Sequence, residues 1–205
     1  MLYLVHLQFF WSSYFYSLFY DRLPSTLTIK KTLPLVLFNQ LTTCLIIYNL
    51  ESSFSNPYIT FKDFFIRWIP ISTVKYLVGI LLLNLQFGTM HYLVHKYRYI
   101  YDKIHYIHHR QIIPLGFGAI YAHPLEHLFV NLLPIITSIL ILDMDILLVT
   151  FFVANLSWMT VQSHTVYKTK ISKSRHGIHH LYNYYNFDNY PYIVDHFLKT
   201  FKNKR

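Results

Sequence analysis

Histidines with helical spacing are the feature of this sequence that most clearly indicates chemistry. Twelve of the 13 histidines lie from residue 91 onward, and most of them stand three or four positions apart. Two segments follow the pattern H-x-x-H-H, and one upstream segment follows H-x-x-x-H. Together with one histidine that stands alone, the nine residues are His91, His95, His105, His108, His109, His164, His176, His179 and His180.

Imidazole side chains at this spacing can meet at a metal ion. Residues three and four apart lie on one face of a helix, so each H-x-x-H-H segment is expected to direct three imidazoles towards one locus. Imidazole binds iron, zinc and copper, and nine such ligands suit two ions. The spacing therefore predicts a site for two metals. His6 and His196 lie outside these patterns and are interpreted as ordinary core or surface residues.

The scarcity of acidic residues excludes several other sites. The chain has only two glutamates, Glu51 and Glu126, so the carboxylate-rich di-iron site of ferritin-like bundles is excluded. The H-E-x-x-H motif of zinc peptidases and the G-x-S-x-G elbow of serine hydrolases are also absent. A dimetal site built from histidine remains, and His123 and His127, again four residues apart, lie close to it in sequence.

The elements that position these histidines are expected to be membrane helices. The chain is 54% hydrophobic and only 13% charged, with a mean hydropathy of +0.30. Its net charge of +9 is spread among apolar and aromatic runs, so we expect no nucleic-acid partner. We expect an all-α integral membrane bundle of about four to five transmembrane or partly embedded helices, with a cytosolic histidine-rich helical cap that holds the metals.

Apolar runs indicate where the helices lie. Residues 128–162 are apolar except for Asp143 and Asp145, so a hairpin that turns at these two residues is expected. N-terminal membrane segments are expected in 1–69 and a domain with the histidine boxes in 70–205. The expected helices are a span or interfacial helix at 2–20, spans at 33–50, 70–90, 128–142 and 146–162, and an interfacial segment at 61–69.

The hairpin also predicts the side on which the histidines lie. Its two outer ends emerge together, so the histidines before residue 128 and after residue 162 share one face of the membrane. From residue 91 onward the chain carries 12 of its 18 lysines and arginines, including Lys168, Lys170 and Lys173. Because cytoplasmic loops carry the excess of basic residues, the histidines are expected to face the cytosol.

The order of these motifs resembles the fatty acid hydroxylase / sterol desaturase superfamily of integral membrane di-iron oxygenases. The resemblance covers roughly residues 75–200 and rests on HYLVH, HYIHH, YAHPLEH, SHTVY and HGIHH. The YAHPLE stretch is closer to the sterol branch, and SHTVY matches that branch at His164 and Tyr167. Near its end the chain keeps Asp195 of the family's pattern and has Val194 in place of a tryptophan.

The resemblance implies roles for individual residues. The nine box histidines would bind two iron ions, with zinc as a possible occupant after overexpression. His108 and His179, in the middle of the two H-x-x-H-H boxes, would be essential for catalysis. His123 would be a ligand or lie beside one. Glu126 is expected to orient a ligand histidine.

The resemblance also implies an activity: O₂-dependent hydroxylation or desaturation at a C–H bond of a sterol or fatty acyl lipid. An external b-type cytochrome and its NAD(P)H reductase would deliver the electrons, because the family's haem motif H-P-G-G does not occur. The endoplasmic reticulum is the implied location. One alternative is a catalytically degenerate protein that keeps the metal site. A metal transporter is a second alternative, and it predicts histidines within the spans.

Overall fold

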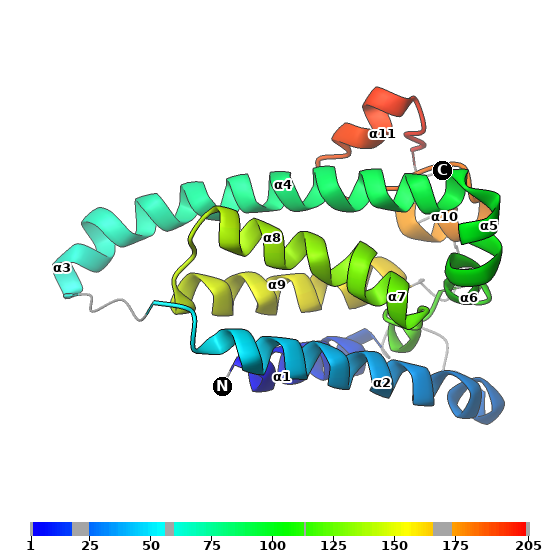
Figure 1. Cartoon of the computed structure of the whole chain (residues 1–205), viewed down its shortest axis with the longest axis horizontal. Helices are drawn as coiled ribbons and strands as arrows, with labels where there is room; N and C mark the ends of the chain where they lie inside the picture. Colours follow the sequence, from blue (N-terminus) through cyan, green and yellow to red (C-terminus); the bar gives the residue numbers. More distant parts are fainter. Residues whose placement is uncertain (1, 18–24, 56–59, 113, 166–173, 204–205) are drawn as a thin grey trace.

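The computed structural model describes residues 2–17, 25–55, 60–112, 114–165 and 174–203. These residues form helices and connecting loops, and no strand occurs among them. The long helices α1 (Leu2–Ser17), α2 (Thr26–Glu51), α4 (Ile69–Lys96) and α9 (Ile146–His164) lie roughly along one direction (Figure 1). The others are α3 (Phe61–Asp63), η1 (Phe64–Trp68), α5 (Arg98–Ile100), η2 (Tyr101–His105), α6 (Tyr106–His109), η3 (Gly116–Gly118), α7 (Pro124–Glu126), η4 (His127–Leu132), α8 (Leu133–Ile141), α10 (Arg175–Tyr182) and α11 (Ile193–Leu198).

Four helical stretches are long and apolar enough to cross a membrane, which confirms the expected all-α membrane bundle. They include all four segments that the sequence predicted as spans. α1 packs against α9 and α2. The predicted helix at 2–20 is described only as far as Ser17, so its full extent lies outside the described residues. The four stretches are Thr28–Glu51, Phe61–Lys96, Pro124–Ile141 and Ile146–His164.

The segment expected to lie in the interface, 61–69, is continuous with the following span. α3, η1 and α4 form one helical rod, and the division expected after residue 69 falls inside it. Around Pro70, which has no N–H to donate, the hydrogen-bond ladder widens, and the Ile69 N–H donates to the Phe64 carbonyl five residues earlier. The same device recurs where the π-helix η4 precedes Pro134.

The predicted hairpin between α8 and α9 turns at Asp143–Asp145, as expected. Asp143 has a φ of 45°, and Lys75 donates from Nζ to its carbonyl at 2.6 Å. Asp145 caps α9 by accepting from the backbone N–H groups of Leu147 and Leu148, both at 3.0 Å. Its second oxygen accepts from Trp68 Nε1 at 2.9 Å. The turn is therefore tied to the rod by two side chains.

A hydrophobic core joins the rod to the hairpin at the end opposite the histidines. Phe152 and Val149 of α9 are fully buried there, with Leu83 of α4 and Ile139 of α8. A Cβ at Gly79 would lie 3.2 Å from the Phe152 ring, so the glycine lets α4 and α9 approach closely. This packing holds α4 and α9 in register, and the far ends of both helices carry histidines.

We predict that Asp145→Ala lowers the stability of the protein by about 1 kcal/mol, because it removes the N-cap of α9 and the acceptor for Trp68. Asp145→Asn should lose less, since its amide oxygen still caps the helix. Thermal unfolding in detergent, followed by circular dichroism, measures both variants. Equal melting temperatures for Asp145→Ala and the wild type would contradict this role of the turn.

Candidate metal centre

The nine box histidines meet at one end of the bundle, where α4, η2, α6, α9 and α10 converge. They form two groups, and within each group the candidate ligand atoms lie within 4.8 Å of one another. The five-histidine group consists of His91, His95, His105, His109 and His179. The four-histidine group consists of His108, His164, His176 and His180. Within the five-histidine group, His91 and His179 are 88 residues apart in sequence, and folding brings their candidate ligand atoms together.

Each H-x-x-H-H box is split between the two groups, which corrects the expectation that a box directs three imidazoles to one locus. His105 and His109, four residues apart, stay together, whereas His108 joins the other group. In the second box His176 and His180 stay together and His179 crosses over. Consecutive helical residues point about 100° apart, so the two members of an H-H pair cannot face one ion.

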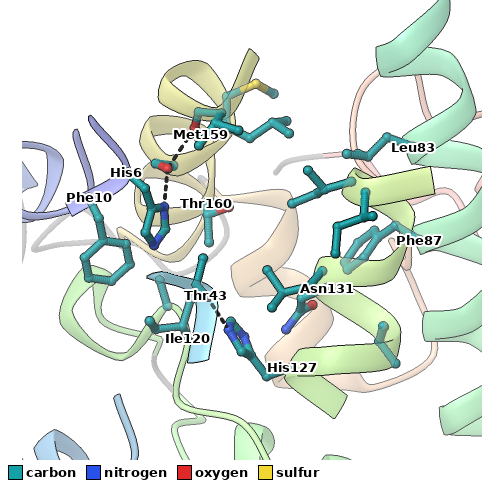
Figure 2. Close-up of a pocket in the computed structure, with 18 of the residues that line it drawn as sticks. His6, Phe10, Thr43, Leu83, Phe87, Ile120, His127, Asn131, Met159 and Thr160 are labelled. Atoms are coloured by element: carbon teal, nitrogen blue, oxygen red, sulfur yellow. Dashed lines mark hydrogen bonds between the residues drawn. The ribbon is translucent and has the colours of Figure 1, made fainter. Parts of the chain in front are cut away.

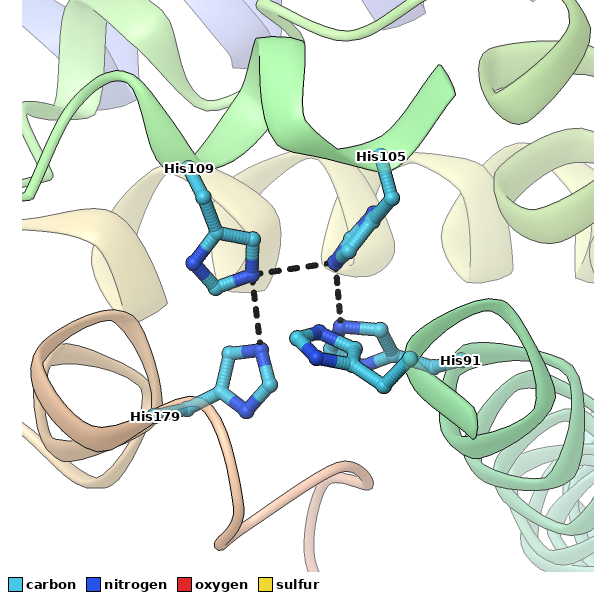
Figure 3. Close-up of side chains that lie close together, drawn as sticks. His91, His105, His109 and His179 are labelled. Atoms are coloured by element: carbon cyan, nitrogen blue, oxygen red, sulfur yellow. Dashed lines mark hydrogen bonds between the residues drawn. The ribbon is translucent and has the colours of Figure 1, made fainter. Parts of the chain in front are cut away.

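Nitrogen atoms within each group lie at the spacing of ligands around an ion. In the five-histidine group, His105 Nε2 is 3.2 Å from His91 Nε2 and 3.0 Å from His109 Nε2 (Figure 3). His109 Nε2 is in turn 3.1 Å from His179 Nε2. With a metal–nitrogen distance of about 2.1 Å, two ligands at a right angle stand about 3 Å apart. The imidazoles are therefore already arranged around a common point.

Backbone carbonyls determine which nitrogen of several imidazoles is free. Nδ1 of His91 lies 2.6 Å from the Phe187 carbonyl, and Nδ1 of His179 lies 2.8 Å from the Tyr185 carbonyl. A carbonyl only accepts, so Nδ1 carries the proton and Nε2 keeps its lone pair.

The four-histidine group has the same arrangement. His108 Nδ1 faces the Tyr121 carbonyl at 3.1 Å, and His164 Nδ1 faces the Thr160 carbonyl at 2.8 Å. Partners of this kind on the far nitrogen are typical of metal-bound histidine.

The contact between His108 and His164 tests whether these residues fit a metal. Their Nε2 atoms are 3.3 Å apart, and the carbonyls on the opposite nitrogens leave a lone pair on both. Two lone pairs cannot form a hydrogen bond and repel one another at this distance. A cation between them converts the repulsion into coordination. The donor set is entirely imidazole, which fits iron or zinc.

The box histidines outside the spanning helices are held neutral, which is the form that binds metal. Burial lowers the pKa of His108 to about 4. Burial and then the neighbouring imidazoles lower the pKa of His105, His179 and His180 well below the usual histidine value. At neutral pH these side chains therefore offer lone pairs without first losing a proton.

Glu126 lies beside a candidate ligand histidine. It is only 4% exposed, and its Oε1 is 2.8 Å from His105 Nδ1. This places a carboxylate on the far nitrogen of a candidate ligand. His123, by contrast, belongs to neither group and caps α7, where its Nδ1 accepts from the Leu125 N–H at 3.2 Å.

The remaining histidines lie apart from both groups. His6 is buried between Ser157 and Gln40, and His196 is exposed and stacks on Phe201. His127 is buried against Thr43. Other sequence features lie outside the described residues: Tyr167 of the SHTVY motif, and the basic residues Lys168, Lys170, Lys173, Lys204 and Arg205.

A C-terminal loop holds two of the orienting carbonyls, and Asp195 holds that loop. Asp195 is fully buried and accepts from the Phe187 N–H at 2.9 Å, the Asp188 N–H at 3.0 Å and the Thr200 hydroxyl at 2.6 Å. A Cβ at Gly88 would lie 2.5 Å from Asp188 Cβ, so the loop packs directly on α4.

Burial and the Asp195 carboxylate raise the pKa of Asp188. Sequence reasoning noted Asp195 but not that it acts through the Phe187 carbonyl on His91.

A largely apolar cavity, called the chamber below, runs from the histidines into the bundle. Along α9 its lining extends from Val149 to His164, which is about 22 Å at 1.5 Å per residue. Its outer end is lined by Leu2, Leu50 and Phe54. Figure 2 shows its middle part, where polar and apolar side chains from several helices face one another. Five candidate ligands line the inner end: His91, His105, His108, His164 and His176.

The fold and the site define a membrane helical bundle with a polyhistidine centre that could hold metal. A family model described as fatty acid hydroxylase matches residues 76–200. The chain therefore belongs to the fatty acid hydroxylase family, and the resemblance seen in the motifs is confirmed. The names of this family and of its relatives, hydroxylase and monooxygenase, are names of oxidoreductases.

Three relatives illustrate the range of the family. Fatty acid hydroxylase ahd1 of Mycosarcoma maydis is 30% identical over 186 residues, covering 87% of this chain and 47% of that protein. Fatty acid hydroxylase domain-containing protein 2 of Homo sapiens is 28% identical, covering 75% of this chain and 46% of that protein. Sphinganine C4-monooxygenase 1 of Arabidopsis thaliana is 33% identical, covering 51% and 44%. The chain spans about half the length of these curated relatives. No solved structure gives a significant match.

We predict that Asp195→Asn lowers metal affinity by about tenfold or more, as loss of an outer partner typically does. The amide can accept from one backbone N–H of the loop, but its own N–H₂ then opposes the other. Metal content after dialysis against a graded chelator series measures the effect. His196→Ala, an exposed neighbour on α11, is the matched control and should retain metal like the wild type. Equal retention by Asp195→Asn would show that the loop does not support the site.

Proposed function

We propose that this protein is an O₂-dependent membrane di-iron oxygenase that acts on a C–H bond of a lipid, as a hydroxylase or a desaturase. The observation that carries the proposal is the position of the two histidine groups at the inner end of a long apolar chamber. Two iron ions, when bound by the nine imidazoles, would supply the activation of O₂ for attack on an unactivated C–H bond. The substrate is proposed to be a sterol or fatty acyl lipid.

The dimensions of the chamber support a lipid substrate. The hydrocarbon core of a bilayer is about 30 Å thick, so one acyl chain covers about 15 Å. The chamber follows α9 for about 22 Å, which accommodates a chain of that length with its reacting end at the histidines. Names of relatives point to the same class of substrate, since they include a fatty acid hydroxylase, a sphinganine monooxygenase and a very-long-chain aldehyde decarbonylase.

Residues of this chain would orient the ligand imidazoles and keep the lipid away from water. Carbonyls of Phe187, Tyr185, Tyr121 and Thr160 orient the imidazoles before any metal binds. The apolar chamber wall excludes water from the lipid and from the reacting carbon. Catalysis depends on such preorganised geometry, because positioning removes the entropy cost of bringing the reactants together.

We also propose that electrons arrive from an external b-type cytochrome and its NAD(P)H reductase on the cytosolic side of the endoplasmic reticulum or an equivalent membrane. Exposed basic side chains at the histidine end support a docking face for an acidic partner. The residues concerned are Lys96, Arg98, Lys103 and Arg110. The basic excess at this end agrees with a cytosolic orientation.

We predict that the metal decides activity. Protein reconstituted with ferrous iron, and supplied with reductase and b-type cytochrome, should consume O₂ when a total lipid extract is added. Zinc-loaded protein should not, because zinc has no redox chemistry. The affinity order places zinc above ferrous iron, so zinc is expected in overexpressed samples. An oxygen electrode and metal analysis of the same samples give the comparison.

Two results would overturn this proposal. Equal product from the iron and zinc forms would indicate hydrolytic rather than oxidative chemistry. Protein that retains two iron ions but consumes no O₂ with sterols or acyl lipids would favour the alternative, a catalytically degenerate metal-binding membrane protein.

We predict that His108→Ala and His179→Ala each abolish product formation in cells. His108 of the first box lies in the four-histidine group, and His179 of the second box lies in the five-histidine group. Each substitution therefore removes the one ligand that a group receives from the other H-x-x-H-H box. Comparative lipidomics of cells that express the wild type or a variant detects the product whichever lipid is the substrate. His196→Ala, which lies outside both groups, should match the wild type. Wild-type product levels in His179→Ala would show that the second box is dispensable.

A further inference from the structure

His127 presents an unused hydrogen-bond acceptor to the chamber. Its Nε2 lies 2.8 Å from Thr43 Oγ1 (Figure 2). The Thr43 hydroxyl also donates to the Asn39 carbonyl at 3.0 Å. The single hydroxyl proton of Thr43 is therefore committed to Asn39, and the Thr43 oxygen accepts from the imidazole Nε2–H. This fixes the tautomer, and Nδ1 of His127 keeps a lone pair.

That lone pair has no partner among the described residues. His127 is only 3% exposed, lines the chamber, and its Nδ1 is buried without a hydrogen bond. A buried acceptor without a donor destabilises a fold, and such groups are rare in native proteins. The unpaired nitrogen is therefore explained if a ligand in the chamber supplies the donor.

Asn131 extends this polar position by one turn of the π-helix η4. Its side chain also lines the chamber and makes no hydrogen bond to the part of the chain that the structure describes. His6 shows the contrast, because it lines the same chamber with both nitrogens engaged by Ser157 and Gln40. Three other buried atoms of the lining are also without a hydrogen bond in the part of the chain that the structure describes: Asn84 Oδ1 and, beside the metal end, His105 Nδ1 and Glu126 Oε2. His127 Nδ1 differs from them in being a neutral imidazole acceptor whose tautomer is fixed by Thr43.

His127 lies close to the metal end of the chamber. Its neighbour Glu126 contacts the candidate ligand His105, so adjacent residues serve the metal centre and the chamber wall. Beyond them the lining becomes apolar towards Leu50 and Phe54. A lipid that fills the chamber would meet a polar position close to the histidines and a mainly apolar surface along its tail, with His6, Asn84 and Ser157 as polar exceptions.

We propose that His127 Nδ1, assisted by the Asn131 amide, binds a hydroxyl group of the lipid substrate. The substrate class is then a long-chain lipid whose hydroxyl lies close to the carbon that is oxidised. This inference rests on the proposed function for the presence of the lipid. It goes further by naming the polar group that the chamber selects and the residue that selects it.

Two ligands that differ in whether they carry a hydroxyl proton test whether the chamber binds a hydrogen-bond donor. Hexadecan-1-ol carries a hydroxyl proton, whereas hexadecyl methyl ether has the same chain and can only accept. Binding of each is measured by displacement of a fluorescent acyl probe from zinc-loaded protein in lipid nanodiscs. Wild type is expected to bind the alcohol about five- to tenfold more tightly than the ether, the range for one hydrogen bond. In His127→Leu this preference should fall to about one. Comparing the preference between variants cancels the different partitioning of the two ligands into lipid.

Two further variants keep the test decisive. Thr43→Val removes the group that fixes the tautomer, so Nδ1 can carry the proton, and the preference for the alcohol should fall although the imidazole remains. Ile135→Val alters the same chamber without touching the acceptor, and its preference should equal that of the wild type. If His127→Leu fails to retain zinc, Thr43→Val carries the test alone.

The proposal is overturned if the wild type shows no preference for the alcohol. It is also overturned if the preference persists in His127→Leu or Thr43→Val protein that retains zinc. Because zinc-loaded protein is measured without turnover, a failure here leaves the iron-dependent activity untouched. Conversely, a missing O₂ reaction with an intact alcohol preference would refute the oxygenase and leave the hydroxyl site standing.

Discussion

The mutual repulsion of imidazole lone pairs is the constraint around which the histidine end of this protein is organised. Backbone carbonyls accept hydrogen bonds from the outer nitrogens of His108 and His164, which therefore carry the protons, so the inner nitrogens face each other without a shared proton. Burial lowers the pKa of the box histidines outside the spans and keeps them neutral, so protonation does not relieve the repulsion. Cations at the centre would relieve this repulsion, and the packing of the other elements supports the arrangement of the histidines.

That support comes from elements far from the centre. The Asp145 cap and the Trp68 and Lys75 contacts tie the hairpin turn to the rod at the opposite end of the bundle. Because α4 and α9 pack against each other there, His91 and His164 near their other ends are brought to the same centre. The C-terminal loop then closes the site with the Phe187 and Tyr185 carbonyls, anchored by Asp195.

The chamber wall contains irregular helix inside a bundle that otherwise consists of regular membrane helices. Each backbone group inside a bilayer must find a partner within the protein, which favours regular helices. Pro70 and Pro134 interrupt that regularity, and a π-helical segment precedes each of them. The second of these turns carries His127 and Asn131 into the chamber wall. Irregular backbone here coincides with the polar part of the cavity, as is common where π-turns occur at functional sites.

The sequence by itself determined the helical class, the spans, the Asp143–Asp145 turn and the nine candidate ligands. These follow from hydropathy, helical spacing and charge, which are local properties of the chain. Only the tertiary structure decided that each H-x-x-H-H box is divided, and that His123 caps a helix instead of joining a group. It also supplied the carbonyl partners and the unpaired nitrogen of His127. Such features depend on how distant helices pack, and a backbone carbonyl has no residue type that could reveal its role in advance.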